Sequence, residues 1–288
     1  MADRSWEFGL HQMIEVKEGC ETTDKIENLA RISYQRFFRR YLWLAGMTGT
    51  AREVTGELWS VYRLATIRIP TNRPLRRKRF PNQIYHTTDE KWRAIINRIA
   101  EIHATRRPIL IGTRSVAASE HLSGLLKERG LSHQLLNARQ DASEAAIIAE
   151  AGGEDKITVA TNMAGRGTDI KVSPQVAQLG GLHVIATEFH EARRIDRQLF
   201  GRSARQGEPG SCEAIVSLQD DLLRFYLQHT AGSFGPVLAQ KLFSIWPSGL
   251  IFQMAQRSAE RMQFWSRSKL LEIDEQLQSA LAFSGKTE

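Results

Sequence analysis

The stretch KITVAT, residues 156–161, runs directly into NMAGRGTDI, residues 162–170. The first part is short and apolar, which is typical of a buried strand, whereas the second is a polar loop with two closely spaced glycines. Further apolar runs occur at 66–70, 108–112, 133–137, 181–187 and 213–218, and helical patterns at 89–106, 115–129, 141–151 and from about 191 separate them. Apolar strands alternating with helices predict an α/β fold, in which helices cover both faces of a parallel sheet.

Length and composition restrict the class of protein. The chain has 288 residues, 42% of them hydrophobic, which is enough for one main domain and an appendage. Its net charge of +7 favours anionic partners such as nucleotides, nucleic acid, acidic lipid or an acidic protein face. Cys20 and Cys212 lack neighbours at metal-ligand spacing, so we expect a reducing, cytoplasmic protein without disulfides. No apolar run is long enough to cross a membrane, so we expect a soluble or peripheral protein.

The flanks of the α/β region have a different pattern. Residues 23–44 predict an amphipathic entry segment. The charge run from Arg73 to Arg79 indicates a solvated connector, and contact with phosphates or acidic lipid is the alternative. From Ser248 to about Ala282 an apolar stripe recurs every three or four positions, which predicts a helix roughly 50 Å long. We expect this stripe to need a partner from elsewhere. Its members are Ile251, Met254, Met262, Trp265, Leu270, Ile273, Leu277 and Leu281.

The glycine loop after 156–161 is the first candidate site, because ligands of parallel sheets bind at the carboxyl ends of the strands. Glycines let backbone N–H groups approach a phosphate or a ribose, and an aspartate can accept from ribose hydroxyls. A plain turn from strand to helix is the alternative. The loop residues are Gly165, Arg166, Gly167, Thr168 and Asp169.

The stretch QLFGRSARQG, residues 198–207, is the second candidate site. A helix would bring Arg202 and Arg205, three positions apart, to one face. Two guanidinium groups held in this way suit a triphosphate whose charge develops during transfer, as an arginine finger does. The alternative is a solvated basic helix face.

Two other stretches look like known motifs but do not fit them. FHEARR, residues 189–194, begins like a zinc-protease signature, but Arg194 stands where the second histidine is required. SGKTE, residues 284–288, lacks the earlier glycine of a phosphate-binding loop, since position 280 is Ala280. We therefore expect no metal site in this chain.

Taken together, these strings resemble the SecA preprotein translocase ATPase family over nearly the whole chain. The residues that carry the resemblance are GLHQMIEVKEG at 9–19, LAGMTGTA at 44–51, TVATNMAGRGTDI at 158–170, GGLHVIATEFHEARRIDRQLFGRSARQGEPGS at 180–211, SLQDDLLR at 217–224 and AQRSAERMQFWSRSKLLEIDEQ at 255–276. The joined strings are far more specific than a generic helicase pattern.

The resemblance implies a fold and a division into domains. Residues 46–230 would form the second nucleotide-binding domain, a RecA-like lobe of the P-loop NTPase type, also described as the helicase C-terminal type. Residues 1–45 would be a junction segment, and residues 231–288 a helical extension similar to the start of the family's scaffold helix. In this family ATP lies in the cleft between two such lobes.

The resemblance also implies roles for the candidate residues. Asp169 would approach the ribose of ATP, whereas Arg202 and Arg205 would face its β and γ phosphates. Gln198 belongs to the same motif, and Arg194 matches an arginine that faces the first lobe.

This sequence departs from the family pattern at several points. Phe189 and Phe200 stand where arginines are usual, and Ala204 stands where a glycine is usual. The chain lacks the Walker A lysine and the Walker B carboxylates of the first lobe, where Mg²⁺ would bind. We therefore do not expect it to hydrolyse ATP alone.

The resulting hypothesis is a SecA-like translocase fragment that contributes the arginine wall of an ATP site. Its partners would be a first lobe on another chain or SecA itself, the Sec channel and the preprotein, with an acidic membrane surface as a further partner at the inner face of the bacterial membrane. The first alternative is a degenerate adaptor that docks on a partner without nucleotide chemistry. The other is half of a nucleic-acid helicase, which the family-specific strings disfavour, so nucleic acid is not expected as a partner.

Overall fold

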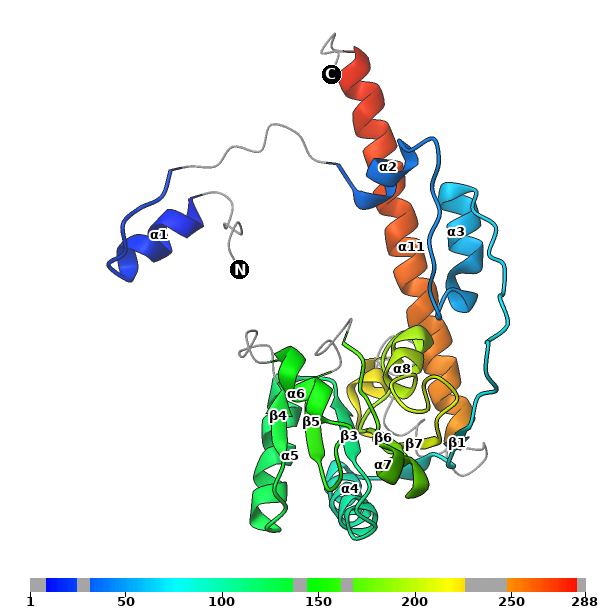
Figure 1. The fold of residues 1–288 in the computed structure, drawn as a ribbon. Coiled ribbons are helices and arrows are strands. Elements are labelled where there is room, and N and C mark those ends of the chain that lie inside the picture. Colours follow the sequence, from blue (N-terminus) through cyan, green and yellow to red (C-terminus); the bar gives the residue numbers. More distant parts are fainter. Residues whose placement is uncertain (1–8, 25–31, 137–143, 162–167, 226–247, 284–288) are drawn as a thin grey trace. The chain divides into compact units, whose positions relative to one another are not determined.

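The fold is taken from a computed structural model, which describes residues 9–24, 32–136, 144–161, 168–225 and 248–283. The chain divides into two compact units (Figure 1). One consists of residues 1–44 with 268–288, and the other of residues 45–267. The predicted sites fall in the second unit.

A seven-stranded sheet forms the centre of the second unit, and every pairing in it is parallel. Its order is β1-β7-β6-β3-β5-β4, and β2 also pairs with β7. The predicted α/β fold with a parallel sheet is confirmed. The strands are β1 (Arg77–Arg79), β2 (Gln83–Tyr85), β3 (Ile109–Thr113), β4 (Gln134–Leu136), β5 (Ile157–Thr161), β6 (Leu182–Ala186) and β7 (Gly210–Ser217).

Helices cover the two faces of this sheet, because alternate residues of each strand point to opposite sides. On one face α4 (Thr88–His103) and α5 (Val116–Glu128) pack on the strands, as Ile99 and Leu122 pack on Ile109 and Val159. On the other face Leu110 and Val184 share a core with α6 (Glu144–Glu150), α8 (Arg193–Phe200) and the start of α11 (Ser248–Phe283). The short helix α7 (Pro174–Gln178) precedes β6.

The long helix α11 confirms the predicted C-terminal helix, but its packing differs from the prediction. Ile251, Phe252, Ala255 and Ala259 are buried in the core of the second unit. The expectation that the whole stripe needs a partner from elsewhere is therefore wrong for the first turns of the helix. The part of the stripe that stays exposed is Met254, Met262, Trp265, Leu270 and Ile273.

The edge of the sheet also differs from the prediction. Residues 66–70 form no strand, and Ile67 and Ile69 are about four-fifths exposed. The edge strand β1 comes instead from the charge run that indicated a connector. Arg77, Lys78 and Arg79 pair with Gly210, Ser211 and Cys212 of β7. An edge strand needs only one hydrogen-bonding neighbour, so its side chains can stay charged and solvated.

Two short segments precede the sheet in the second unit, the 3₁₀ helix η1 (Arg52–Val54) and the helix α3 (Thr55–Tyr62). Glu57 of α3 accepts two hydrogen bonds from Arg267, of 2.6 and 2.7 Å. This bidentate pair ties α3 to α11 within the unit.

The first unit contains α1 (Leu10–Lys17) and α2 (Tyr34–Arg39). The predicted entry segment 23–44 is helical only over α2, and residues 25–31 lie outside the described part. Asp274 accepts a 3.0 Å hydrogen bond from the backbone N–H of Ser33, and Arg39 pairs with Glu275 at 2.5 Å. The end of α11 is thus held to α2 in this unit.

Candidate functional site

Asp169 and Arg205 meet beyond the carboxyl end of the sheet. Asp169 follows β5, and Arg205 follows α8, so the fold brings together residues 36 positions apart. Nη1 of Arg205 lies 2.6 Å from Oδ1 of Asp169, and the two side chains are 37% and 56% exposed. Thr168 lies beside this pair, half-buried. Gly165, Arg166 and Gly167 of the same predicted site lie outside the described residues.

The turn after α8 holds Arg205 in place. The helix ends at Phe200, and Arg77 of β1 donates from Nη1 to the carbonyl of Phe200 at 2.8 Å. The Ser203 hydroxyl donates to the carbonyl of Leu182 at 3.0 Å. Arg205 itself donates from Nε to the carbonyl of Gly201 at 3.2 Å. Arg77 thus joins β1 to the C-terminal end of α8, and the Ser203 hydroxyl joins the following turn to β6.

The expectation that a helix presents both arginines on one face is wrong. Arg202 lies two residues beyond the last residue of α8, and Ala204 between the arginines has a positive φ of 56°. The arginines belong to a tight turn, since a left-handed residue cannot continue a right-handed helix. Their relative placement therefore depends on this turn rather than on helical periodicity.

Gln198 and Arg194 lie on α8 itself. Gln198 donates from Nε2 to the hydroxyl of Thr50 at 3.2 Å, so it contacts the segment before η1. Arg197, on the same helix, forms an ion pair with Glu53. Arg194 is half-buried, and no ion pair joins it to a carboxylate of the described chain.

Phe189 and Phe200, two of the predicted departures from the family pattern, are both buried. Their side chains are 7% and 6% exposed, and both belong to the core on the α8 face of the sheet. The ring of Phe189 lies 5.3 Å from that of Phe252 in α11. The guanidinium of Arg79 lies 5.3 Å from the ring of Phe200. Both phenylalanines therefore pack on α11 or on β1.

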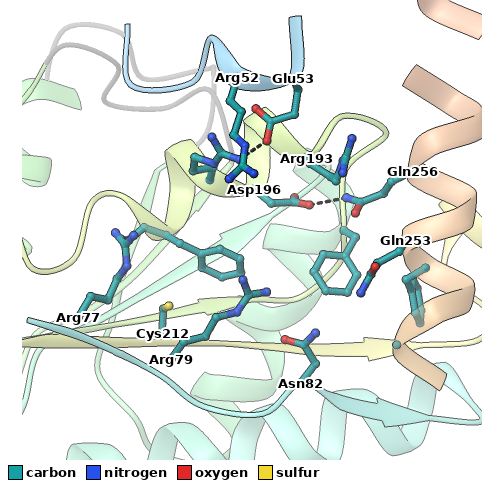
Figure 2. A pocket seen from close by; sticks show the side chains of 15 residues that line it. Arg52, Glu53, Arg77, Arg79, Asn82, Arg193, Asp196, Cys212, Gln253 and Gln256 are labelled. Atoms are coloured by element: carbon teal, nitrogen blue, oxygen red, sulfur yellow. Dashed lines mark hydrogen bonds and ion pairs between the residues drawn. The ribbon is translucent and has the colours of Figure 1, made fainter. Parts of the chain in front are cut away.

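These two rings line a cavity of about 580 Å³ within the second unit, which we call the arginine-lined cavity. Figure 2 shows Arg79, Asn82 and Gln253 converging on its middle. Sequence reasoning missed it, because the residues of β1 were predicted to be a connector. Its lining is Arg52, Glu53, Arg77, Arg79, Asn82, Phe189, Arg193, Asp196, Arg197, Phe200, Cys212, Gly249, Phe252, Gln253 and Gln256.

Polar contacts join α8 and the loop before it to α11. Arg193 forms a bidentate pair with Glu260, with nitrogen–oxygen distances of 2.7 and 3.2 Å. Gln256 donates to Asp196 at 2.6 Å and to the carbonyl of His190 at 2.8 Å. The helix that leads to the arginine turn is therefore anchored on α11.

A buried ion pair lies beyond the ends of β6 and β7. Nζ of Lys91 is 2.6 Å from Asp220 and 3.6 Å from Glu188, and the Lys91 side chain is 1% exposed. Burial raises the pKa of Asp220 to about 7, with Lys91 opposing the rise and Glu188 adding to it. The signal for Lys91 was in the sequence, since it stands one turn before Ile95 on the apolar face of α4.

A second buried network lies between β6 and β7. Arg107 donates to the Ser211 hydroxyl at 2.6 Å, and that hydroxyl lies 2.8 Å from Nδ1 of His183. Nε2 of His183 lies 2.9 Å from Glu213, which also accepts from Arg98 at 2.7 Å. Burial lowers the pKa of His183. Burial alone would raise the pKa of Glu213, but hydrogen bonds from His183 and Arg98 outweigh it and lower this pKa to about 2. The histidine is thus neutral and the glutamate ionised.

Within the described ranges, the structure contains no helix of the length and apolarity that a membrane span requires. The same residues bring no three His, Cys, Asp or Glu side chains together in a way that could hold a metal ion.

Comparison with known proteins places this chain in a family. A family model described as the SecA P-loop domain matches residues 74–177 and 171–234, and one described as the SecA DEAD-like domain matches residues 5–59. The chain is 51% identical over 292 residues to "Protein translocase subunit SecA 2" of Nitrosospira multiformis, covering 100% of this chain and 43% of that protein. It is likewise 51% identical over 293 residues to "Protein translocase subunit SecA 2" of Bordetella avium, covering 99% of this chain and 44% of the relative.

Among solved structures, the chain is similar to the E. coli DEAD-box protein SrmB bound to regulator of ribonuclease activity A, with a TM-score of 0.41, 22% identity, and coverage of 52% of this chain and 82% of that one.

The chain spans less than half the length of the two SecA 2 relatives. The P-loop match covers more than half of this chain and includes Asp169, Arg202 and Arg205. The chain therefore belongs to the SecA protein translocase family.

Proposed function

We propose that this chain contributes one wall of an ATP site in a SecA-type translocase motor. Arg202 and Arg205 would face the β and γ phosphates, and Asp169 the ribose. The opposite wall, with the Walker A lysine and the Walker B carboxylates, would come from a first nucleotide-binding lobe outside the described residues. ATP turnover at the joined site would drive preprotein export.

The observation that carries this proposal is the meeting of Asp169 and Arg205 beyond the carboxyl ends of the strands. Ligands of open α/β sheets bind at this edge. The guanidinium of Arg205 is held by two hydrogen bonds that use Nε and Nη1. Nη2 makes no hydrogen bond within the described chain, so it remains available for a phosphate oxygen. A cation fixed in advance can stabilise charge that develops in the transition state without reorganising.

The proposal assigns Mg²⁺ no ligand from the described part of this chain, where no carboxylate cluster suits it. The metal would be held by the first lobe together with the phosphates of ATP. This chain would add positive charge and position, while the groups that activate water would belong to its partner. We therefore expect no turnover by this chain without that partner.

Relatives named as translocase subunits support the choice of substrate. By that likeness the further partners would be the Sec channel and an unfolded preprotein. The place of action would be the cytoplasm and the inner face of the bacterial cell membrane. Gln198 and Arg194 on α8 would belong to the same motif, with Arg194 facing the first lobe.

The test is ATP turnover by this chain mixed with a separately purified first lobe that carries the Walker residues. We expect Arg205→Ala to lower kcat about a thousandfold or more, because it removes a charge that acts in the transition state. Arg129→Ala, at the C-terminal end of α5, removes the same charge elsewhere and should leave kcat unchanged. Equal turnover by the wild type and Arg205→Ala would contradict the finger role.

A second candidate is an adaptor that docks on a partner without nucleotide chemistry. The observation that favours it is the exposed part of α11, where Met262 and Trp265 are 41% and 71% exposed. Calorimetry distinguishes the two candidates. Association with the first lobe that is independent of ATP and unchanged by Arg205→Ala would support the adaptor, whereas ATP-dependent association would support the motor.

A further inference from the structure

The arginine-lined cavity carries more positive charge than its own carboxylates balance. Arg193 and Arg197 are paired with Glu260 and Glu53. In contrast, Arg52, Arg77 and Arg79 have no carboxylate within ion-pair distance in the described ranges of the chain.

The unpaired cations differ in what holds them. Arg77 is bound by the carbonyls of Phe200 and Ser203, at 2.8 and 3.4 Å. Arg79 lies over the ring of Phe200, and Arg52 is exposed at the mouth of the cavity. All three line the same cavity, so an anion bound there gains from their positive charge. The first turn of α11 adds to this, because Gly249 lines the cavity and backbone N–H groups at a helix N-terminus favour negative charge.

The floor of the cavity is apolar and aromatic. Phe189, Phe200 and Phe252 are each less than a tenth exposed, and the cavity reaches all three. Asn82, between β1 and β2, and Gln253 of α11 point into the same space, as Figure 2 shows, and can form hydrogen bonds there. The volume of about 580 Å³ lies within the range of roughly 300–1,000 Å³ that small-molecule sites have.

We propose that the arginine-lined cavity binds a small aromatic anion, with its phosphate or carboxylate group at Arg52 and Arg79 and its ring against Phe200 and Phe252. The site is separate from the proposed ATP wall. Its residues lie on the face of α8 that meets α11, whereas Arg205 and Asp169 lie in the turn beyond the helix and after β5. A ligand there would contact the helix that leads into the arginine turn.

The test is calorimetric titration of the whole chain with four probes: 1-naphthyl phosphate, 1-naphthoate, neutral 1-naphthol and inorganic phosphate. We expect at least one of the two aromatic anions to bind at least about tenfold more tightly than naphthol or inorganic phosphate, since only they satisfy both the cations and the rings. The order of the two aromatic anions identifies the anionic group. Absence of binding by both aromatic anions would overturn the proposal.

Matched variants locate the bound probe. Arg79→Gln is expected to weaken binding about tenfold, because it removes one charge-assisted contact. Arg52→Gln comes from a different segment and carries the same expectation, so the test survives if one variant fails to fold. Arg205→Gln should leave the affinity unchanged. Unchanged affinity in both cavity variants, or loss of affinity only in Arg205→Gln, would overturn the proposal. Neither result would contradict the proposed ATP role, which the turnover assay tests separately.

Discussion

Ala204 lies between Arg202 and Arg205 and adopts a left-handed backbone with a φ of 56°. Its side chain is 8% exposed, so the methyl group is also enclosed. An L-residue in this conformation brings Cβ too close to the following carbonyl, which glycine avoids. Ala204 therefore stands at a position suited to glycine.

Ala204→Gly is therefore expected to raise the free energy of unfolding by about 1 kcal/mol, after the entropy lost by glycine is taken into account. Urea unfolding measures the free energy of unfolding of the wild type and of the variant. Ala255→Gly, in the interior of α11, is the matched control and should lower the same quantity by about 1 kcal/mol. Destabilisation by both substitutions would show that the turn does not strain Ala204.

His183 is a second residue for which the direction of an effect on stability can be predicted, in this case its dependence on pH. Its pKa is lowered in the folded protein because it is fully buried, so the folded state binds a proton less readily than the unfolded state. As the pH falls below about 6.5, the unfolded chain takes up the proton and the folded chain does not. Acidification therefore weakens folding through this group.

We expect the wild type to lose more stability than His183→Gln between about pH 7 and pH 5, because the buried imidazole disfavours its proton in the folded state. Urea unfolding at a series of pH values gives the two slopes. Equal slopes for wild type and His183→Gln would contradict the assigned effect of burial.

At the scale of elements, the sequence predicted the inner strands well. β3, β5 and β6 are continuous apolar runs whose residues are nearly all buried, so hydrophobicity alone identifies them. The edge strand could not be found in this way. Arg77–Arg79 has no apolar pattern, and its pairing is decided by the neighbouring β7, whereas Ile67 and Ile69 alternate like a strand and find no partner.

The candidate site was predicted in part for the same reason. The chemistry of Asp169 and Arg205 could be read from residue types, because Asp169 follows a predicted strand and Arg205 follows a predicted helix. The turn that places Arg205 could not, since it depends on a left-handed Ala204 and on a hydrogen bond from distant Arg77. The arginine-lined cavity was missed because its walls come from β1, α8 and α11, which are far apart in the sequence.

In the whole molecule, the residues proposed to face ATP all belong to the unit that contains the parallel sheet. The matched P-loop domain contains Arg202 and Arg205, whereas the DEAD-like match ends at residue 59. We propose that this chain forms one side of a shared ATP site. In this proposal Arg205 acts on the transition state of phosphoryl transfer rather than on bound ATP.

The most direct test compares the affinities of two nucleotides for the complex of this chain with a first lobe. ADP with aluminium fluoride resembles the transition state, and a non-hydrolysable ATP analogue resembles the ground state. We predict that Arg205→Ala weakens the binding of ADP with aluminium fluoride by about a hundredfold or more. The same substitution should weaken the binding of the ATP analogue by less than about tenfold, because the contact forms mainly in the transition state. Equal losses for the two nucleotides, or no loss for either, would contradict this prediction.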